Sequence, residues 1–245
     1  MKQFVGMTNY IKMWKDTIFI KSFYHNLVWI LIGTSLPIAI GLPLAVILWS
    51  GVRGFNIFRT IFFMPIVLAP MIVGIIWGWI YNPVFGIANE FLRRIGLGSL
   101  ARGWLADPAT ALPALIIAAA WHYYGFCIVI FLAGLQNVDL SLIDAAKVDG
   151  ANSWQRFFYI IVPQLREVLT MITVYTLIGG FKVFDIVFVV TQGGPAHATE
   201  LMATYLYKQV FQLNYVGYGA AIAIFLAFLV IIVSVSFIRL RERIS

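Results

Sequence analysis

Long apolar stretches, each bounded by charged or turn-forming residues, dominate the pattern of this sequence. A helix that crosses a membrane needs about 20 consecutive, mostly apolar residues. Five stretches meet that requirement, near residues 26–49, 60–81, 109–135, 166–190 and 216–238. They lack the alternating ten-residue pattern that is typical of outer-membrane barrel strands. The pattern therefore predicts an all-α fold, a polytopic membrane helix bundle with about five transmembrane helices.

Two short segments flank this predicted membrane domain of residues 26–239. Residues 1–25 have no uninterrupted apolar core of the kind found in a cleavable signal peptide, because charged residues recur through them: Lys2, Lys12, Lys15, Asp16 and Lys21. We expect this segment to be amphipathic and to lie at the membrane surface. Residues 240–245 are predicted to form a short cytoplasmic tail.

The composition indicates a membrane protein and favours some classes of binding partner over others. Apolar residues make up 62% of the chain, charged residues 11%, and the mean hydropathy is +0.92, far outside the values of soluble domains. The net charge of +7 comes from residues scattered at the ends of the apolar stretches, which favours lipid head groups over nucleic acid as a partner. Cys127, the single cysteine, cannot form an intrachain disulfide and is expected to be a buried apolar residue.

A polar loop at residues 136–165 separates the third and fourth apolar stretches. Ser141 is predicted to cap a short helix whose third position is Asp144, in a capping-box arrangement. Gly150 can adopt the left-handed conformation that ends a helix. A second helix is expected from Ser153, up to the break at Pro163. Its apolar face would combine Trp154, Phe157, Phe158 and Ile161.

This loop has two readings. Gly150 and Pro163 can simply punctuate an ordinary loop whose aromatic residues pack on neighbouring spans. The combination of a small-residue pair, a fixed turn and an apolar face instead favours a helix pair that inserts into a partner's groove. A DNA-reading helix-turn-helix would need basic residues, and the loop offers Lys147 and Arg156 alone.

The loop also resembles a known family motif. The residues Asp144-Ala145-Ala146, Gly150, Ile160 and Pro163 match the EAA loop of permease subunits of ATP-binding cassette importers, whose pattern is EAA, three residues, G, nine residues, I, one residue, LP. The spacing is kept throughout, with Asp144 in place of Glu and Val162 in place of Leu. The resemblance implies a type I importer permease fold, with this loop as the cytoplasmic coupling-helix loop.

A second segment is similar to carbohydrate permeases of the maltose and glycerol-phosphate type. It consists of Phe181-Lys182-Val183-Phe184-Asp185, then Thr191-Gln192-Gly193-Gly194-Pro195, and Thr199. Such permeases usually carry one more span before a segment like Phe4 to Tyr10. The resemblance therefore implies either a five-span core or a protein that starts upstream of Met1.

The resemblance implies a division of labour in the plasma membrane of a bacterial or archaeal cell. Two permease subunits, usually different chains, form the pathway, two ATPase subunits hydrolyse ATP, and an external solute-binding protein delivers sugar. Lysine and arginine residues are equally frequent on the two sides of the predicted spans, so their distribution does not identify the cytoplasmic side. The resemblance of the loop to the EAA motif identifies it instead. The residues implied to contact the ATPase are Asp144, Ala145, Ala146, Asp149, Gly150, Ala151, Phe157, Ile160 and Pro163.

Catalytic and metal-binding motifs are missing from the sequence. It contains no G-x-x-x-x-G-K-[ST] phosphate loop, no H-E-x-x-H and no G-x-S-x-G. His25, His122 and His197 stand apart from one another, without the spacing of metal ligands. We therefore expect a transport subunit without catalytic residues, metal or cofactor.

The substrate pathway is less defined. Lys182 and Asp185 are spaced to share one helical face, either as a local ion pair or as pathway residues. Gly193, Gly194 and Pro195 are expected to form a turn outside the membrane that contacts the binding protein. Five aromatic residues either stack on sugar rings or belong to interface belts: Trp77, Trp79, Trp121, Tyr123 and Tyr124. A permease for another small polar solute, or an ion-coupled secondary carrier, is the alternative function.

Overall fold

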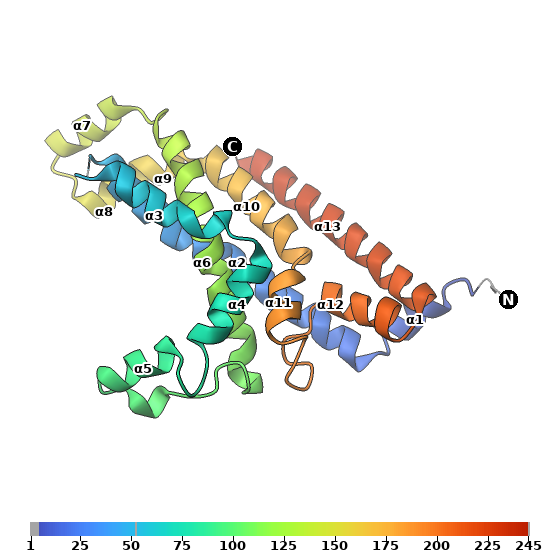
Figure 1. The fold of residues 1–245 in the computed structure, drawn as a ribbon. Helices are drawn as coiled ribbons and strands as arrows, with labels where there is room; N and C mark the ends of the chain where they lie inside the picture. Colours follow the sequence, from blue (N-terminus) through green and yellow to red (C-terminus); the bar gives the residue numbers. More distant parts are fainter. Residues whose placement is uncertain (1–4, 52, 245) are drawn as a thin grey trace.

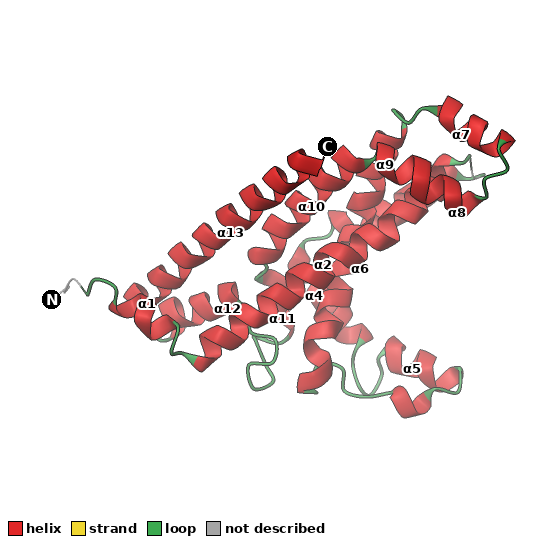
Figure 2. Cartoon of the chain, turned by 180° about the vertical axis from the view of Figure 1, so that it is seen from behind, coloured by secondary structure: helices red, strands yellow, loops and turns green. Residues whose placement is uncertain are grey.

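The computed structural model describes residues 5–51 and 53–244, and in this part of the chain every regular element is a helix (Figure 2). The centre is formed by two long helices that pack against each other, α2 (Thr17–Trp49) and α6 (Pro108–Leu135). Gly41 permits this contact, because a Cβ there would lie 2.7 Å from the Cβ of Cys127. Cys127 is fully buried between the helices, as predicted.

The other long helices surround this pair. Helix α3 (Phe55–Val67) packs on α6, and α10 (Arg166–Phe181) packs on α2 and on α13 (Val216–Ile244). Within the described residues, three helical segments are long and apolar enough to cross a membrane: Thr17–Trp49, Pro108–Leu135 and Val216–Arg239. Two bent helix pairs raise the number to five if each pair is one span.

The first helix begins earlier than predicted, at Thr17 instead of near residue 26. The carboxylate of Asp16 caps it by accepting hydrogen bonds from the amides of Ile18 and Phe19, at 3.0 and 3.3 Å. The expected surface segment of residues 1–25 is thus reduced to α1 (Thr8–Met13) and a short linker, and residues 1–4 lie outside the described part. At the other end, α13 continues to Ile244, so residues 240–244 extend the helix; Ser245 lies outside the described part.

The second predicted span is not one helix. It consists of α3 and α4 (Pro70–Ile80), which meet at an angle of 101°. The break follows from Pro70, which lacks an amide proton and forces the residue before it into an extended conformation. Ala69 adopts φ −63° and ψ 141° as a result.

The fourth predicted span is also broken. Helix α10 ends at Phe181, just after Gly179 and Gly180, and α11 (Asp185–Val190) starts after three intervening residues. Glycine weakens a helix interior, and Phe184 between the two helices is not helical, with φ −135° and ψ −57°. A further bend of 72° separates α10 from the preceding helical segment of residues 153–164.

Two groups of short elements lie at opposite ends of the bundle (Figure 1). One end carries α7 (Leu140–Val148), α8 (Ser153–Arg156), a π-helical turn η2 (Phe157–Ile161) and α9 (Val162–Gln164). The other end carries α5 (Ile87–Arg94), η1 (Gly98–Leu100), the loop of residues 191–201, α12 (Met202–Tyr207) and a second π-helical turn, η3 (Lys208–Gln212).

Candidate functional site

The polar loop of residues 136–165, which we call the docking loop, starts with α7. Its N-cap is Asp139 and not Ser141, because the Asp139 carboxylate accepts hydrogen bonds from the Ser141 hydroxyl and amide at 2.7 and 2.9 Å. These hydrogen bonds lower the pKa of Asp139. Asp144, predicted as part of the cap, instead forms an exposed ion pair with Lys147 at 2.8 Å. Asp144 and Ala145 are therefore open to a partner on the outer surface of α7.

The turn between α7 and α8 depends on Gly150. Its φ of +81° is the left-handed conformation that side chains other than glycine rarely adopt. The amide of Ala151 then reaches back to the carbonyl of Ala146 at 2.8 Å, and Asp149 closes the helix as its C-cap. Asn152 and Gln155 form a capping box that starts α8.

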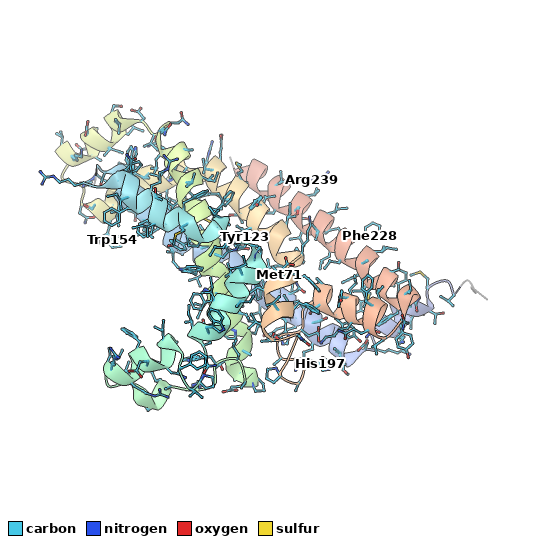
Figure 3. The ribbon with its side chains drawn as sticks, in the orientation of Figure 1. Met71, Tyr123, Trp154, His197, Phe228 and Arg239 are labelled. Carbon is cyan, nitrogen blue, oxygen red and sulfur yellow. The ribbon has the colours of Figure 1, made fainter. Side chains whose placement is uncertain are left out.

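The aromatic residues after this turn contact one another, but the face that they form is only partly buried. The π-helical turn at Phe157–Ile161 widens the helix and changes the direction of successive side chains. Phe157 and Ile161 pack into the core beneath, whereas Trp154 stacks on Phe158 at 6.0 Å and both point outwards. Trp154 is 72% exposed and marks this end of the molecule in Figure 3.

The docking loop is fixed to the bundle at several points. Ile143 is buried and Ile160 packs against the same core cluster. The amide of Asp139 donates to Gln164 Oε1 at 2.8 Å and so joins the start of the loop to its end. Pro163 is exposed inside α9, and the chain bends at Leu165 instead of at the proline. The docking loop is therefore packed directly against the base of α10.

A cavity of about 360 Å³ lies where the two broken helices meet the central pair. Pro70 from the α3–α4 break, residues 182–185 from the α10–α11 break, and residues of α2 and α6 line it. Lys182 and Asp185 both reach the cavity, one from the end of α10 and the other from the start of α11. They do not lie on one helical face, and the ion pairs of the described residues do not join them.

Aromatic side chains form much of the cavity wall. Tyr123 is the member of the five predicted aromatic residues that lines it, and Figure 3 shows Tyr123 between the two ends of the molecule. Trp77 and Trp121 pack on each other at 5.8 Å, while Trp79 is 65% exposed. The sequence did not single out the other aromatic lining residues, because distant segments bring them together: Trp29, His122, Tyr175 and Phe184.

The loop of residues 191–201 is held by internal contacts at the end opposite the docking loop, where Figure 3 shows His197. Gly193 is buried with φ +81°, and a Cβ there would lie 2.5 Å from a carboxylate oxygen of Glu200. The Thr199 hydroxyl donates to the carbonyl of Gly194 at 2.7 Å. Gly194 and Pro195 are half-buried, so they present less surface than an open turn would.

Glu200 is a buried charge that the sequence reasoning missed. Its side chain is fully buried and lies 2.6 Å from the Lys208 ammonium, 3.0 Å from His197 Nδ1 and 2.7 Å from the Thr204 hydroxyl. Glu200 is the only Asp, Glu, Lys or Arg between residues 186 and 207, a signal that could have identified it.

Comparison with known proteins identifies the fold and the family. Residues 18–245 match the family model described as binding-protein-dependent transport system inner membrane component. The probable ABC transporter permease protein YurN of Bacillus subtilis is 36% identical over 91% of this chain and 77% of its own length. The lactose transport system permease protein LacF of Rhizobium radiobacter is 32% identical over 99% of this chain and 83% of its own.

A solved structure with the same fold is a chain of a bacterial alginate ABC transporter in complex with an alginate pentasaccharide-bound periplasmic protein. It superposes with a TM-score of 0.88 at 22% identity, over 99% of this chain and 85% of the other. The predicted type I importer permease fold is thereby confirmed. The chain belongs to the family of inner-membrane components of binding-protein-dependent transport systems, as a multi-pass permease subunit of an ATP-binding cassette importer.

Proposed function

We propose that this permease forms the translocation pathway for sugars or related polyols. The observation that supports this most directly is the cavity at the two helix breaks, where Tyr123 and Tyr175 stand beside Lys182 and Asp185. Apolar and aromatic walls with a few polar groups suit a polyhydroxylated solute. Lys182 supplies one positive charge to the cavity and Asp185 one negative charge. Because the two charges balance, the cavity favours a solute without net charge. The lactose permease LacF, 32% identical, supports the same substrate class.

The proposed assembly contains a second permease, two ATPase subunits and an external solute-binding protein. ATP hydrolysis takes place in the ATPase subunits, because the 245 residues contain no phosphate-binding loop. This chain is accordingly a transport subunit and not an enzyme. Binding-protein contact is proposed for the loop that includes Gly193, Gly194 and Pro195, at the end opposite the docking loop.

The ATPase contact is proposed for the docking loop. Asp144, Ala145 and Gly150 are exposed, and Val148 and Trp154 offer apolar side chains that are 87% and 72% exposed. Ala146 and Ala151 allow a partner to approach the turn closely, and Asp149 adds a charge beside it. Phe157, Ile160 and Pro163 join this surface to the base of α10. Movement of the ATPase subunits would thus displace α10, and the far end of α10 lines the cavity.

Transport by the reconstituted complex tests this function. The four-subunit transporter is placed in proteoliposomes with its binding protein, and uptake of lactose, glycerol and methionine is measured with and without ATP. We expect ATP-dependent uptake of the sugar or the polyol and none of methionine. Asp185→Asn and Lys182→Met should lower uptake without loss of assembly. Methionine uptake, or sugar uptake that a sodium or proton gradient drives without ATP, would contradict the proposal.

A further inference from the structure

The segment of residues 82–107 connects the ends of α4 and α6 and contains helix α5. The segment joins the end of α4, at Ile80, to the start of the long apolar helix α6, at Pro108, and so lies at one end of a candidate span. Figure 1 shows α5 at the end of the bundle opposite α7. Helix α5 packs against η1 and the end of α4 and extends away from the central helices.

The inward side of α5 carries one buried polar residue, Asn89, beside the half-buried Ala88 and Leu92. Asn89 is 2% exposed, and its side-chain nitrogen donates to the carbonyl of Arg102 at 2.9 Å. Its side-chain oxygen accepts hydrogen bonds from the Arg102 amide at 3.2 Å and from the Trp104 indole at 2.8 Å. These three bonds fix the orientation of α5 on the following loop. The face opposite Asn89 therefore points away from the protein.

The outward side of α5 is apolar. Ile87, Phe91 and Ile95 follow one another at intervals of four residues and are 72%, 59% and 51% exposed. Such a spacing places them in one stripe along the helix. Val84 and Phe85, just before α5, are 81% and 67% exposed. In a helix surrounded by water the apolar stripe faces the protein, whereas this stripe of α5 faces outwards.

A basic side chain lies beside this stripe. Arg93 and Arg94 are in the last turn of α5, Arg94 next to the stripe, and Glu90 pairs with Arg94 at 2.9 Å and with Arg93 at 3.9 Å. Arg94 remains 78% exposed and is long enough to reach phosphate groups while its methylenes cover apolar surface. Trp79, near the end of α4, is 65% exposed as well. Tryptophan is common at the boundary between acyl chains and head groups.

We propose that α5 is an interfacial anchor that lies along the outer surface of the membrane. Ile87, Phe91 and Ile95 insert into the acyl-chain boundary, and Arg93 and Arg94 contact lipid phosphate groups. The position at the end of α6, the outward-facing apolar stripe and the exposed Arg94 beside it together favour lipid over a protein partner. Through Asn89 and the end of α4, the anchor holds the outer half of the broken α3–α4 span at a fixed depth.

Fluorescence quenching in the complete transporter tests the anchor. Cys127, the single cysteine, is replaced by Ala, and Phe91→Cys or Glu90→Cys is labelled with bimane in nanodiscs that contain lipids with an acyl-chain nitroxide. We expect quenching at Phe91 to exceed quenching at the adjacent Glu90 by about twofold or more. If Phe91→Cys prevents assembly, Ile95→Cys takes its place in the same comparison.

The opposite results overturn the proposal. Equal quenching at Phe91 and Glu90, or no quenching at Phe91, would mean that the stripe does not enter the bilayer. Efficient photocrosslinking from position 91 to the second permease or to the binding protein would assign the stripe to a protein interface. Either outcome is independent of which solute the transporter carries.

Discussion

The Nε2 atom of His122, on α6, lies 3.0 Å from the carbonyl oxygen of Leu68, at the end of α3. In a continuous helix that carbonyl would accept the amide of Ile72, but at the break this amide bonds to the carbonyl of Ala69 instead. The imidazole therefore supplies the hydrogen bond that the break removes. It also ties the α3–α4 break to the wall of the cavity, which His122 lines.

Replacement of His122 by Leu should destabilise the complex, because the Leu68 carbonyl loses its donor. An unpaired buried polar group costs about 1–3 kcal/mol. His122→Gln keeps a donor on a side chain of similar length and should recover part of the loss. Thermal unfolding of the purified complex measures both variants. Equal midpoints for His122→Leu and the wild type would show that the hydrogen bond does not support the break.

Gly125 is the closest point between α3 and α6. A Cβ at this position would lie 2.0 Å from the carbonyl oxygen of Phe62, so Gly125→Ala must push the two helices apart. Overpacking of this kind costs about 1–3 kcal/mol. Gly78→Ala on α4 is the matched control, since no atom lies within 4 Å of its Cβ position. We expect a lower unfolding midpoint for Gly125→Ala alone, and similar midpoints for the two variants would contradict the close contact.

Hydropathy predicted where helices form but not where they break. The third stretch, predicted at residues 109–135, is the helix Pro108–Leu135, because apolar length and its Asp107 cap act locally. The stretch of residues 60–81 is equally apolar on both sides of Pro70, so a count of apolar residues cannot register the 101° bend. The break at residues 182–184 is likewise invisible to composition.

Local motifs predicted the docking loop better than the cavity. Gly150 acts within its own turn, and its conformation could be inferred from residue type alone. The cap could not, because Asp139 and Ser141 are both residue types that cap helices, and the geometry of the chain selects Asp139 and places Ser141 inside α7. The cavity combines segments far apart in the sequence, for which a single sequence gives no contact information.

Substitution of Gly150 by Val should separate ATP hydrolysis from transport. At φ +81° a β-branched residue is strained, so the turn between α7 and α8 must change. Gly150→Asn is the control, because asparagine tolerates the left-handed conformation. We expect Gly150→Val to assemble but to lose ATP-driven uptake in proteoliposomes, while Gly150→Asn retains most of it. Normal uptake by the Val variant would remove this turn from the coupling mechanism.

Asp16 should make the stability of the complex sensitive to acid. Burial raises its pKa, but hydrogen bonds from Tyr205, Tyr218 and two amides outweigh burial, so the pKa is lower than usual. A depressed pKa stabilises the fold above the unfolded value of about 3.9, and this contribution is lost as the pH falls further.

The Asp16→Asn variant isolates this effect, since asparagine still caps α2 but does not titrate. Thermal midpoints are compared between pH 6 and a pH of about 3, below the unfolded pKa. We expect the wild-type advantage at pH 6 to shrink at the lower pH. A constant difference between the two proteins across this window would mean that Asp16 keeps its ordinary pKa in the fold.

The charge pair of Glu200 and Lys208 should be important for stability because Glu200 is fully buried. Glu200→Gln leaves the Lys208 ammonium, which is 19% exposed, without its carboxylate; loss of one partner of a buried pair costs about 3–5 kcal/mol. The control Glu90→Gln breaks two exposed pairs, with Arg93 and Arg94, each worth about 0–1 kcal/mol. In the double variant with Lys208→Met the unpaired charge is gone, so part of the lost stability should return. Unfolding midpoints that fall equally for Glu200→Gln and Glu90→Gln would show that the pair is not desolvated in the assembled transporter.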